Sequence, residues 1–446
     1  MTPPASAPAA AIPWQRGLAW LLFLGPFFFL SYGFANGMAA RWQVSASHVY
    51  EWERHIPFVP WTIVPYWSID LLYGLSFLLC RSVQQVDRHA LRLLTAQLLS
   101  VACFLAFPLT FSFARPATDG LFGGLFDALA GFDQPYNQAP SLHIGLLVII
   151  WVRFAGASRG LARLVVDLWA ALIAASVLTT YQHHFIDLPT GALVGLLCLW
   201  LWPDDGPAPL AAARLTPSPQ RRRLALLYGL AGLGFTALGI GLGGAGLWLC
   251  WPGLATALVA LNYAFIGPEG FQKRAGRHSL ASTALLLPYT LAARLNAWLW
   301  THRRPQPDEV ADGVWLGRLP DAAAMRAGGF RGLVDLTAEL PAPAGPWAYA
   351  GLPWLDLTPP TPSQLEAAAR HITRLQPGGP VLVACALGYS RSASAVAAWL
   401  ITTRRAASVD EAVAMLQRAQ PRVVLGPAHR QALASLSPIV EISGGA

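Results

Sequence analysis

The chain has 446 residues, of which 54% are hydrophobic and only 12% are charged, and its net charge is +8. This composition excludes an ordinary soluble globular protein, and the length allows about three domains. The basic residues fall in short clusters between apolar runs, which is typical of membrane topology signals and argues against nucleic-acid binding. The five cysteines form no disulfide framework that the sequence can identify.

The first 300 residues contain apolar runs of the length that a membrane-spanning helix requires, about 20 residues. We expect residues 1–16 to be disordered and eight spans to follow. An alternative for the first run is a signal peptide, because small residues follow it. The expected spans lie near residues 17–35, 59–80, 91–113, 143–158, 161–179, 185–202, 223–245 and 247–266.

The loops between these spans alternate in charge. Basic residues cluster in every second loop, so the positive-inside rule places both termini in the cytoplasm. Residues 203–222 are rich in proline and are expected to form a linker. Residues 279–300 are apolar but contain Pro288 and Arg294, and we expect an interfacial helix there. The alternative, a ninth span, would move everything after it to the other side of the membrane.

Residues 305–446 follow as a soluble domain. Short apolar runs predict strands, and amphipathic runs predict helices, in an order that is typical of an α/β domain. The expected strands are Val314–Leu316, Gly332–Leu336, Trp354–Leu355 and Val381–Val383, and the expected helices are Ser363–Leu375, Ser392–Thr403 and Val409–Gln417.

A reactive cysteine is predicted directly after the last of these strands. Cys385 and Arg391 stand in the spacing Cys-x5-Arg between a strand and a helix. A tight loop at a helix N-terminus directs several backbone N–H groups to one point, which forms an anion site. The helix dipole and Arg391 favour the thiolate of Cys385, and Gly388 lets the backbone curve around an oxyanion. The alternative is a buried structural cysteine near a surface arginine.

This segment resembles the signature of the cysteine-based protein tyrosine and dual-specificity phosphatases, and the likeness extends over about residues 306–440. The resemblance implies that Cys385 is the nucleophile, that Arg391 holds the phosphate and that Ser392 donates to the sulfur. It also points to Asp356 as the general acid, although a solvated or helix-capping aspartate is the alternative. Ala384 stands where the family usually has histidine. The other phosphate-binding residues implied are Ala386, Leu387, Gly388, Tyr389 and Ser390.

A second constellation involves histidines of the apolar half. His143 opens the fourth expected span, and the segment Tyr181-Gln-His-His-Phe-Ile-Asp187 lies between the fifth and the sixth. A nucleophilic histidine needs a carboxylate partner, and Asp187 follows His183 by one helical turn. A second histidine can protonate a leaving alkoxide. The alternative is a cluster of interfacial histidines without catalytic function.

These motifs resemble the PAP2 family of lipid phosphatases over about residues 60–202. The sequence around His183 is most similar to the inositol phosphorylceramide synthase branch of that family. The resemblance implies His183 as nucleophile, Asp187 as the carboxylate that orients it and His143 as general acid. It also assigns Arg115 and Ser141 to phosphate binding. Two basic positions of the family are replaced here by Pro108 and Val177, so fewer cations surround the phosphate.

With both regions taken together, the chain resembles bacterial fusions of a PAP2 phosphatase and a dual-specificity phosphatase. They imply a helical membrane domain with a PAP2-like six-helix core, followed by a cytosolic α/β domain. The domains expected are the PAP2-like domain at 17–202, the linker at 203–222, two extra spans with the interfacial helix at 223–304, and the phosphatase-like domain at 305–446.

The expected protein is a bifunctional phosphatase of a bacterial cytoplasmic membrane that acts on phosphomonoesters without a metal or cofactor. We expect membrane lipids and a phosphorylated lipid or protein as partners. No lysine lies between Cys385 and Arg391, which disfavours a polyphosphorylated inositol headgroup. One alternative is a PAP2 half that transfers lipid headgroups, with the C-terminal domain as a protein phosphatase or regulator. Another is a non-catalytic scaffold that binds phosphate.

Overall fold

The computed structural model describes residues 13–211 and 213–436. The chain forms two compact units, Met1–Ala211 with Gly243–Ala245 and Ala212–Leu242 with Gly246–Ala446. Residues 1–12 of the tail expected to be disordered lie outside the described residues, and the first helix begins at Trp14, inside the segment assigned to that tail.

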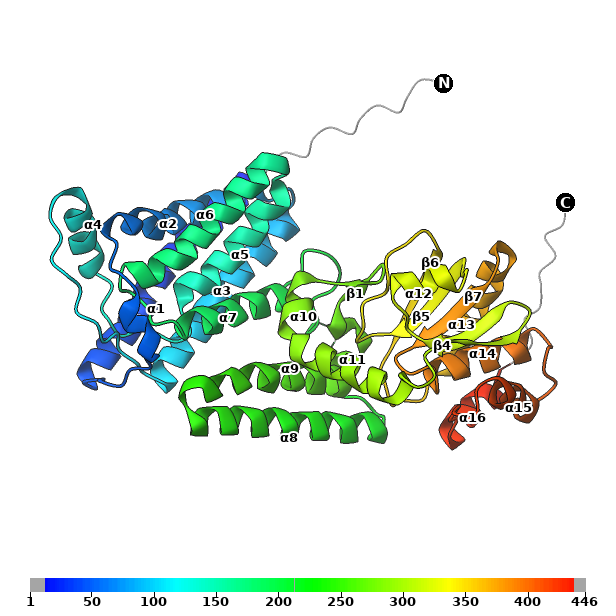
Figure 1. Ribbon diagram of the computed structural model, residues 1–446. Coiled ribbons are helices and arrows are strands. Elements are labelled where there is room, and N and C mark those ends of the chain that lie inside the picture. The colour runs from blue at the N-terminus through cyan, green and yellow to red at the C-terminus, as the bar shows by residue number, and fades with distance from the viewer. Residues whose placement is uncertain (1–12, 212, 437–446) are drawn as a thin grey trace, which may run out of the picture. The chain divides into compact units, whose positions relative to one another are not determined.

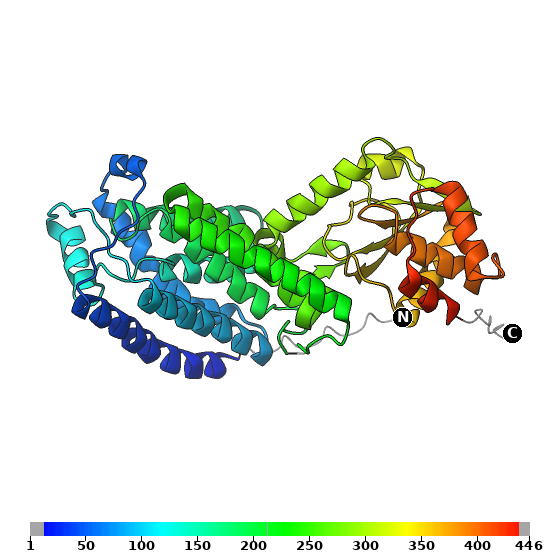
Figure 2. The ribbon, with the colours of Figure 1, turned by 90° about the horizontal axis from the view of Figure 1, so that it is seen from below.

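The first unit is a helical bundle (Figure 1). Figure 2 shows its first helix, α1, in dark blue at the edge of the bundle. The segment between α3 and α5, expected as a loop, contains a further helix, α4. The helices are α1 (Trp14–Arg41), α2 (Ile63–Ser76), α3 (Val83–Ala106), α4 (Gly120–Ala130), α5 (Leu142–Ala157), α6 (Gly160–Thr179) and α7 (Asp187–Leu201).

Six helical segments in the described part of the chain are long and apolar enough to span a membrane, and two other expected spans are shorter apolar helices. α5 has 16 residues and α7 has 15. The six are Trp14–Arg41, Pro60–Leu79, Val83–Ala106, Gly160–Thr179, Pro219–Leu242 and Gly244–Ile266. Helices of this length and composition indicate a membrane protein.

Small residues bring α5 and α7 into close contact. A Cβ atom on Gly191 would lie 2.3 Å from the carbonyl oxygen of Ser141, and one on Gly195 would lie 2.5 Å from that of Gly145. Glycine therefore lets the two backbones approach, as it does at other helix interfaces in membranes. The N-terminal ends of both helices come together, because the Ser141 N–H donates to the carbonyl oxygen of Asp187 at 3.0 Å.

The second unit begins with a helical hairpin of α8 (Pro219–Leu242) and α9 (Cys250–Leu261), which Figure 1 shows as two adjacent helices. Gly253 packs where a Cβ atom would lie 2.4 Å from Thr236 Oγ1. Short turns, a two-stranded ribbon and two helices then lead to the α/β part. These elements are η5 (Asn262–Ile266), η6 (Pro268–Phe271), β1 (Lys273–Arg274), β2 (Arg277–His278), α10 (Leu280–Leu285) and α11 (Leu287–Thr301).

The α/β part is built on a five-stranded sheet in the order β3-β4-β7-β5-β6, in which β3 is antiparallel to β4 and the other neighbours are parallel. β6 begins before its expected position, and β3, α12 and α16 were not predicted. The strands are β3 (Asp308–Ala311), β4 (Val314–Arg318), β5 (Gly332–Thr337), β6 (Ala348–Trp354) and β7 (Val381–Cys385), and the helices are α12 (Ala322–Ala327), α13 (Pro362–Leu375), α14 (Arg391–Thr402), α15 (Val409–Ala419) and α16 (Pro427–Ala434).

Alternate residues of the central strand β7 serve two cores. Val381, Val383 and Cys385 face a core formed with α13, α14, α15 and α16. Leu382 and Ala384 face a smaller core that includes Met325 of α12. The alternation follows from the two-residue period of a strand, and it confirms the α/β class. The predicted order of helical membrane region and α/β domain is therefore correct.

Candidate active sites

The first candidate site is the loop between β7 and α14. Gly388 in this loop has φ +84°, and a Cβ atom there would lie 2.6 Å from the carbonyl carbon of Gly317. Only glycine fits this conformation and this close approach. The Gly388 N–H donates to Cys385 Sγ at 3.2 Å, so the loop curves around the sulfur.

Cys385 lies at the bottom of this loop. Its residue is 3% exposed, and its Sγ lies 3.2 Å from Ser392 Oγ in the first turn of α14. The Gly388 N–H and the Ser392 hydroxyl both stabilise a negatively charged sulfur, as does the N-terminus of α14. The structure thus brings together three residues that the sequence assigned to one site.

Arg391 is buried and held by two carboxylates. Its Nη2 lies 2.6 Å from Glu339 Oε1 and 3.1 Å from Asp356 Oδ1, and its Nη1 lies 3.0 Å from Glu339 Oε2. Burial alone would lower the pKa of Arg391, but these carboxylates outweigh it and raise the pKa well above its ordinary value. Arg391 is therefore a permanent cation at the mouth of the loop.

The guanidinium keeps one donor, Nε, available. Glu339 occupies the two terminal nitrogens, whereas the buried Nε of Arg391 has no hydrogen-bond partner among the described residues. A buried donor without a partner is costly, so a ligand oxygen is expected there. Nε and Nη2 form the fork that can grip two phosphate oxygens, but Nη2 also contacts Glu339 and Asp356, so Nε is the donor that is free.

The remaining loop side chains are tied to the surrounding structure. The Tyr389 hydroxyl accepts from Arg422 at 3.2 Å, and Ser390 Oγ lies 3.2 Å from His429 Nε2. Burial lowers the pKa of His429, which favours its neutral form beside the loop. Ala386 is buried and Leu387 is half-buried, so these two residues contribute their backbone to the loop.

Glu339 was not predicted from the sequence. Burial alone would raise its pKa, but Arg391 lowers it, so Glu339 is ionised in this pair. The one signal that could have identified Glu339 is its position two residues after the end of β5. Because β5 is the neighbour of β7 in the sheet, a residue at that end of β5 lies close to the Cys385 loop. The sequence alone did not establish that neighbour relation.

The second candidate site lies in the helical unit, where α5 and α7 begin. His183 Nδ1 lies 3.2 Å from Asp187 Oδ2, and both side chains are buried. The carboxylate accepts the Nδ1 proton and leaves Nε2 with a lone pair. The structure therefore pairs the two residues that the sequence paired, in the tautomer that a nucleophile requires.

The neighbouring His184 has a different environment. Its Nε2 lies 3.2 Å from the Ser112 backbone N–H, which can only donate, so Nε2 is the acceptor. Its Nδ1 therefore carries the proton and donates to Glu53 Oε2 at 3.1 Å. Glu53 also accepts from the Phe185 N–H at 2.8 Å. Glu53 was not predicted, because it lies 130 residues before the histidines and outside any motif.

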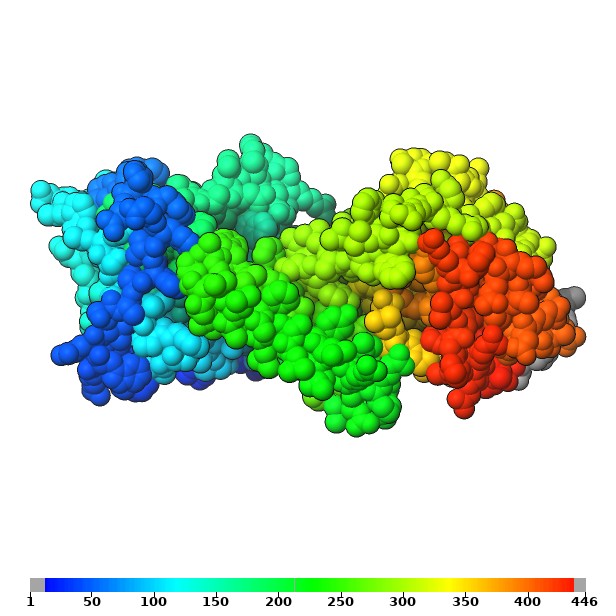
Figure 3. Space-filling model, turned by 60° about the horizontal axis from the view of Figure 1, so that its bottom comes forward, coloured from blue at the N-terminus to red at the C-terminus, as the bar shows by residue number. Residues whose placement is uncertain are grey.

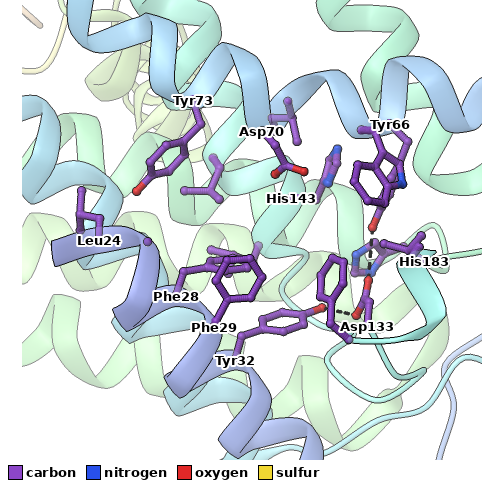
Figure 4. Close-up of a pocket in the computed structure, with 17 residues that line it drawn as sticks. Leu24, Phe28, Phe29, Tyr32, Tyr66, Asp70, Tyr73, Asp133, His143 and His183 are labelled. Atoms are coloured by element: carbon purple, nitrogen blue, oxygen red, sulfur yellow. Dashed lines mark hydrogen bonds between the residues drawn. The ribbon is translucent and has the colours of Figure 1, made fainter. Parts of the chain in front are cut away.

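His143 and His183 line one cavity of about 300 Å³ (Figure 4). The His143 ring stacks on Tyr66 with ring centroids 4.2 Å apart. Its Nε2 is buried and has no hydrogen-bond partner within the described residues, so it is available to a ligand. The apolar wall of the cavity consists of aromatic and aliphatic side chains, including Leu24, Phe28, Phe29, Trp67, Leu129, Phe132 and Leu146.

Two carboxylates also line this cavity. Asp133 accepts from the Tyr32 hydroxyl at 2.8 Å, and its other oxygen lies 3.5 Å from the Tyr66 hydroxyl. Figure 4 shows Asp70 beside His143 and Asp133 beside His183. Neither Asp70 nor Asp133 belongs to a motif, and neither was among the predicted site residues.

The two residues assigned to phosphate binding here have other contacts. The Arg115 guanidinium lies over the Phe126 ring, 4.8 Å from its centroid, and its buried Nε has no partner within the described chain. Ser141 caps α5, since its Oγ accepts from the Ile144 N–H at 3.3 Å. Neither residue is among those that line the cavity, so phosphate binding by these two residues remains a prediction.

Two family models match the chain. Residues 321–437 match "Dual specificity phosphatase, catalytic domain" and residues 89–206 match "PAP2 superfamily". Both are phosphatase domains, so the chain is an enzyme of the phosphoric monoester hydrolase class that joins the two. No curated protein matches the chain.

Several solved structures are similar to part of the chain. Human DUSP28 is 26% identical over 28% of this chain and 92% of its own, with a TM-score of 0.26. Tk-PTP in its active form is 28% identical over 29% and 95%, with a TM-score of 0.26. PTPMT1 is 22% identical over 29% and 92%, with a TM-score of 0.27.

Proposed function

We propose that this membrane protein hydrolyses phosphomonoesters at the Cys385 site by a thiophosphate mechanism and that its substrates are lipid phosphates. The observation that carries the proposal is the arrangement around the sulfur. Gly388 N–H and Ser392 Oγ each lie 3.2 Å from Cys385 Sγ, at the N-terminus of the helix that begins with Arg391.

The reaction proceeds in two displacements. The Cys385 thiolate attacks phosphorus and the P–O bond to the alcohol breaks, while Asp356 gives its proton to the departing oxygen. Water then attacks the thiophosphate, Asp356 takes a proton from it, and the sulfur leaves as a thiolate stabilised by the Ser392 hydroxyl. Arg391 holds two phosphate oxygens through both steps.

At the second site we propose that His183 acts as the nucleophile. The Nδ1 contact with Asp187 leaves the Nε2 lone pair free to attack phosphorus, and Asp187 stabilises the imidazolium that forms. His143, which lines the same cavity and whose buried Nε2 has no partner among the described residues, gives a proton to the leaving alkoxide. Water or another alcohol then takes the phosphoryl group from His183.

We also propose that the two sites face opposite sides of a bacterial cytoplasmic membrane, with both termini and Cys385 in the cytoplasm. The alternation of basic loops supports this topology. A thiol-alkylating reagent that cannot cross membranes should spare Cys385 in intact cells and inactivate it in inverted vesicles. A reporter fused after Ala446 should read as cytoplasmic, and an external reading would overturn the topology.

The decisive experiment measures phosphate release from a panel of lipid phosphates by full-length wild type, Cys385→Ser and His183→Ala. The proposal expects each substitution to remove a separate part of the activity. If Cys385→Ser releases phosphate from every lipid as fast as wild type, and a soluble aryl phosphate is also unaffected, the thiophosphate mechanism is wrong.

A second candidate function for the helical half is transfer of a phosphorylated headgroup between lipids. The cavity beside His183 supports it, because Asp70 and Asp133 line the cavity and the lining includes neither lysine nor arginine. Nearby carboxylates repel a doubly charged phosphomonoester more strongly than a singly charged phosphodiester. Phosphodiester lipids with an added lipid alcohol should therefore give a transfer product that depends on His183 and persists in Cys385→Ser. Free phosphate alone would support hydrolysis.

A further inference from the structure

The segment between the two phosphatase domains contacts the loops that form the Cys385 site. This segment, residues 219–301, lies outside both family matches, which end at 206 and begin at 321. Apart from Gly243–Ala245, it belongs to the same compact unit as the α/β part. Its contacts with the site are therefore a property of this chain, beyond what the phosphatase domain alone supplies.

The loop that carries Asp356 is held by the helical hairpin. The Tyr263 hydroxyl donates to the Asp356 carbonyl oxygen at 2.9 Å, and Gln220 Nε2 donates to the next carbonyl oxygen, that of Leu357. Leu357 has φ +56°, a left-handed conformation that a leucine rarely adopts without support. The two hydrogen bonds fix the backbone on which Asp356 stands.

The loop that carries Glu339 is held by the β1–β2 ribbon. The Lys273 ammonium is buried, lies 2.5 Å from Asp335 Oδ2 and donates to the Thr337 carbonyl oxygen at 2.8 Å. His278 Nε2 lies 2.8 Å from the Ala338 carbonyl oxygen, which can only accept. These contacts cover the residues between β5 and Glu339, so they fix the carboxylate that orients Arg391.

The end of α11 contacts the phosphate loop itself. The Trp300 carbonyl oxygen accepts from the Tyr389 hydroxyl at 3.3 Å and from Arg422 at 3.1 Å. Figure 3 shows the amber segment that follows β6 between the green hairpin and the red C-terminal helices. The acid loop, the Glu339 loop and the phosphate loop are thus each in contact with residues 219–301.

The contacts also locate the site relative to the membrane. Gln220 lies at the start of α8, and Tyr263 follows the end of α9, so both lie at the same end of the hairpin. Arg221 confirms this proximity, because its Nε donates to the Tyr263 carbonyl oxygen at 3.1 Å. Pro219–Leu242 and Gly244–Ile266 are both candidate spans, so we expect this end of the hairpin at a bilayer surface.

We infer that Tyr263, Gln220 and Lys273 are positioning residues of the Cys385 site. They hold its loops at the bilayer surface, and its substrates are therefore phosphomonoesters carried by membrane lipids. The inference rests on the proposed function of Cys385. Tyr263 and Gln220 set the position of the acid, and Lys273 sets the position of Glu339 and so of Arg391. The hairpin is in this sense a structural part of the phosphatase.

The first test separates positioning from stability. Full-length Tyr263→Phe loses the hydroxyl that holds the Asp356 loop and keeps the ring that packs against Tyr228. Loss of one hydrogen bond should lower kcat for an alkyl phosphate about 5- to 10-fold and leave an activated aryl phosphate nearly unchanged, since only the poor leaving group needs the acid. Tyr228→Phe is the matched control, because its ring packs 5.4 Å from that of Tyr263.

The second test uses Lys273. Lys273→Met leaves the Asp335 carboxylate buried without its cation, so the Glu339 loop should shift and vanadate should bind more weakly. The double variant Lys273→Met with Asp335→Asn removes both charges and should recover vanadate binding. If Lys273→Met does not fold, Tyr263→Phe still decides the question. An equal loss of kcat for the alkyl and the aryl phosphate in Tyr263→Phe, or no loss for either, would overturn the positioning role.

The third test addresses the substrate. We compare two substrates of the wild-type protein in lipid nanodiscs, a lipid phosphomonoester in the same bilayer and a soluble phosphopeptide. The kcat/KM for the lipid should exceed that for the peptide by a factor on the order of 10 or more, because the bilayer concentrates the lipid. Equal or better use of the peptide overturns the lipid assignment. The same assay is run in a His183→Ala background, where lipid-phosphate hydrolysis that survives Cys385→Ser overturns the proposed function itself, so the two failures are distinguishable.

Discussion

The two phosphate sites of this protein are built in contrasting ways. The Cys385 site comes mainly from one contiguous loop that ends in a permanent cation, Arg391. The His183 site combines residues from several helices and loops, and carboxylates surround its histidines. A contiguous loop concentrates backbone donors on one phosphate, whereas a dispersed site depends on packing between distant segments. The first therefore suits tight phosphate binding, and the second suits a larger, less charged substrate.

The largest effect that separates the sites is loss of the sulfur nucleophile. Full-length Cys385→Ser should lose vanadate-sensitive hydrolysis of a soluble aryl phosphate down to background, because a serine hydroxyl remains protonated where a thiol can ionise. The measurement is product release with His183→Ala as control, which should keep this activity. Undiminished turnover in Cys385→Ser would mean that Cys385 is not the nucleophile for this substrate.

The next effect concerns the tautomer of His183. Asp187→Asn cannot accept the Nδ1 proton in the same way, so activity of the histidine site should fall by a factor on the order of 10⁴, as for a wrong tautomer in a catalytic triad. Phosphate release or headgroup transfer is measured in a Cys385→Ser background. Ser112→Ala removes the Ser112 hydroxyl, which lies 3.1 Å from His184 Nε2, and should have a much smaller effect. Equal losses in the two variants would contradict a nucleophilic His183.

A smaller effect is expected for the acid of the cysteine site. Asp356→Asn should slow hydrolysis of alkyl phosphates by about 10²–10⁴-fold and of activated aryl phosphates much less. The ratio of the two rates, measured in one preparation, is independent of how much protein is folded. An unchanged ratio would show that Asp356 has a structural role and that the acid lies elsewhere.

The smallest effect tests how far the dispersed site depends on its remote support. Glu53→Gln weakens the contacts to the His184 ring and the Phe185 N–H, and it should destabilise the helical unit by about 1–3 kcal/mol. Thermal unfolding in detergent should show the loss, while the Cys385 activity at low temperature stays the same. A change in both units would indicate that they unfold together.

The contrast also explains what the sequence can and cannot predict. Cys385, Gly388, Arg391 and Ser392 are close in sequence, so a strand, a turn and a helix place them together without knowledge of the tertiary fold. The same holds for His183 and Asp187, which are one turn apart. Local geometry is sufficient in both cases.

Long-range partners were not predictable in this way. Glu339 reaches Arg391 only because β5 lies next to β7, and Glu53 reaches His184 only through the folding of a loop that has no motif. The α4 helix and the early start of β6 were missed for a related reason. Short elements depend on tertiary packing more than on their own periodicity.

The buried lysine of β1 has a consequence for the evolution of fused enzymes. A phosphatase domain that is cut out at residue 305 would lose Lys273 and would leave the Asp335 carboxylate buried without a cation, at a cost of about 3–5 kcal/mol. The two phosphatase domains joined here are thus not freely interchangeable modules. Recombination at the family boundary would yield a weakened enzyme, so the connecting segment and the catalytic domain must be inherited as one piece.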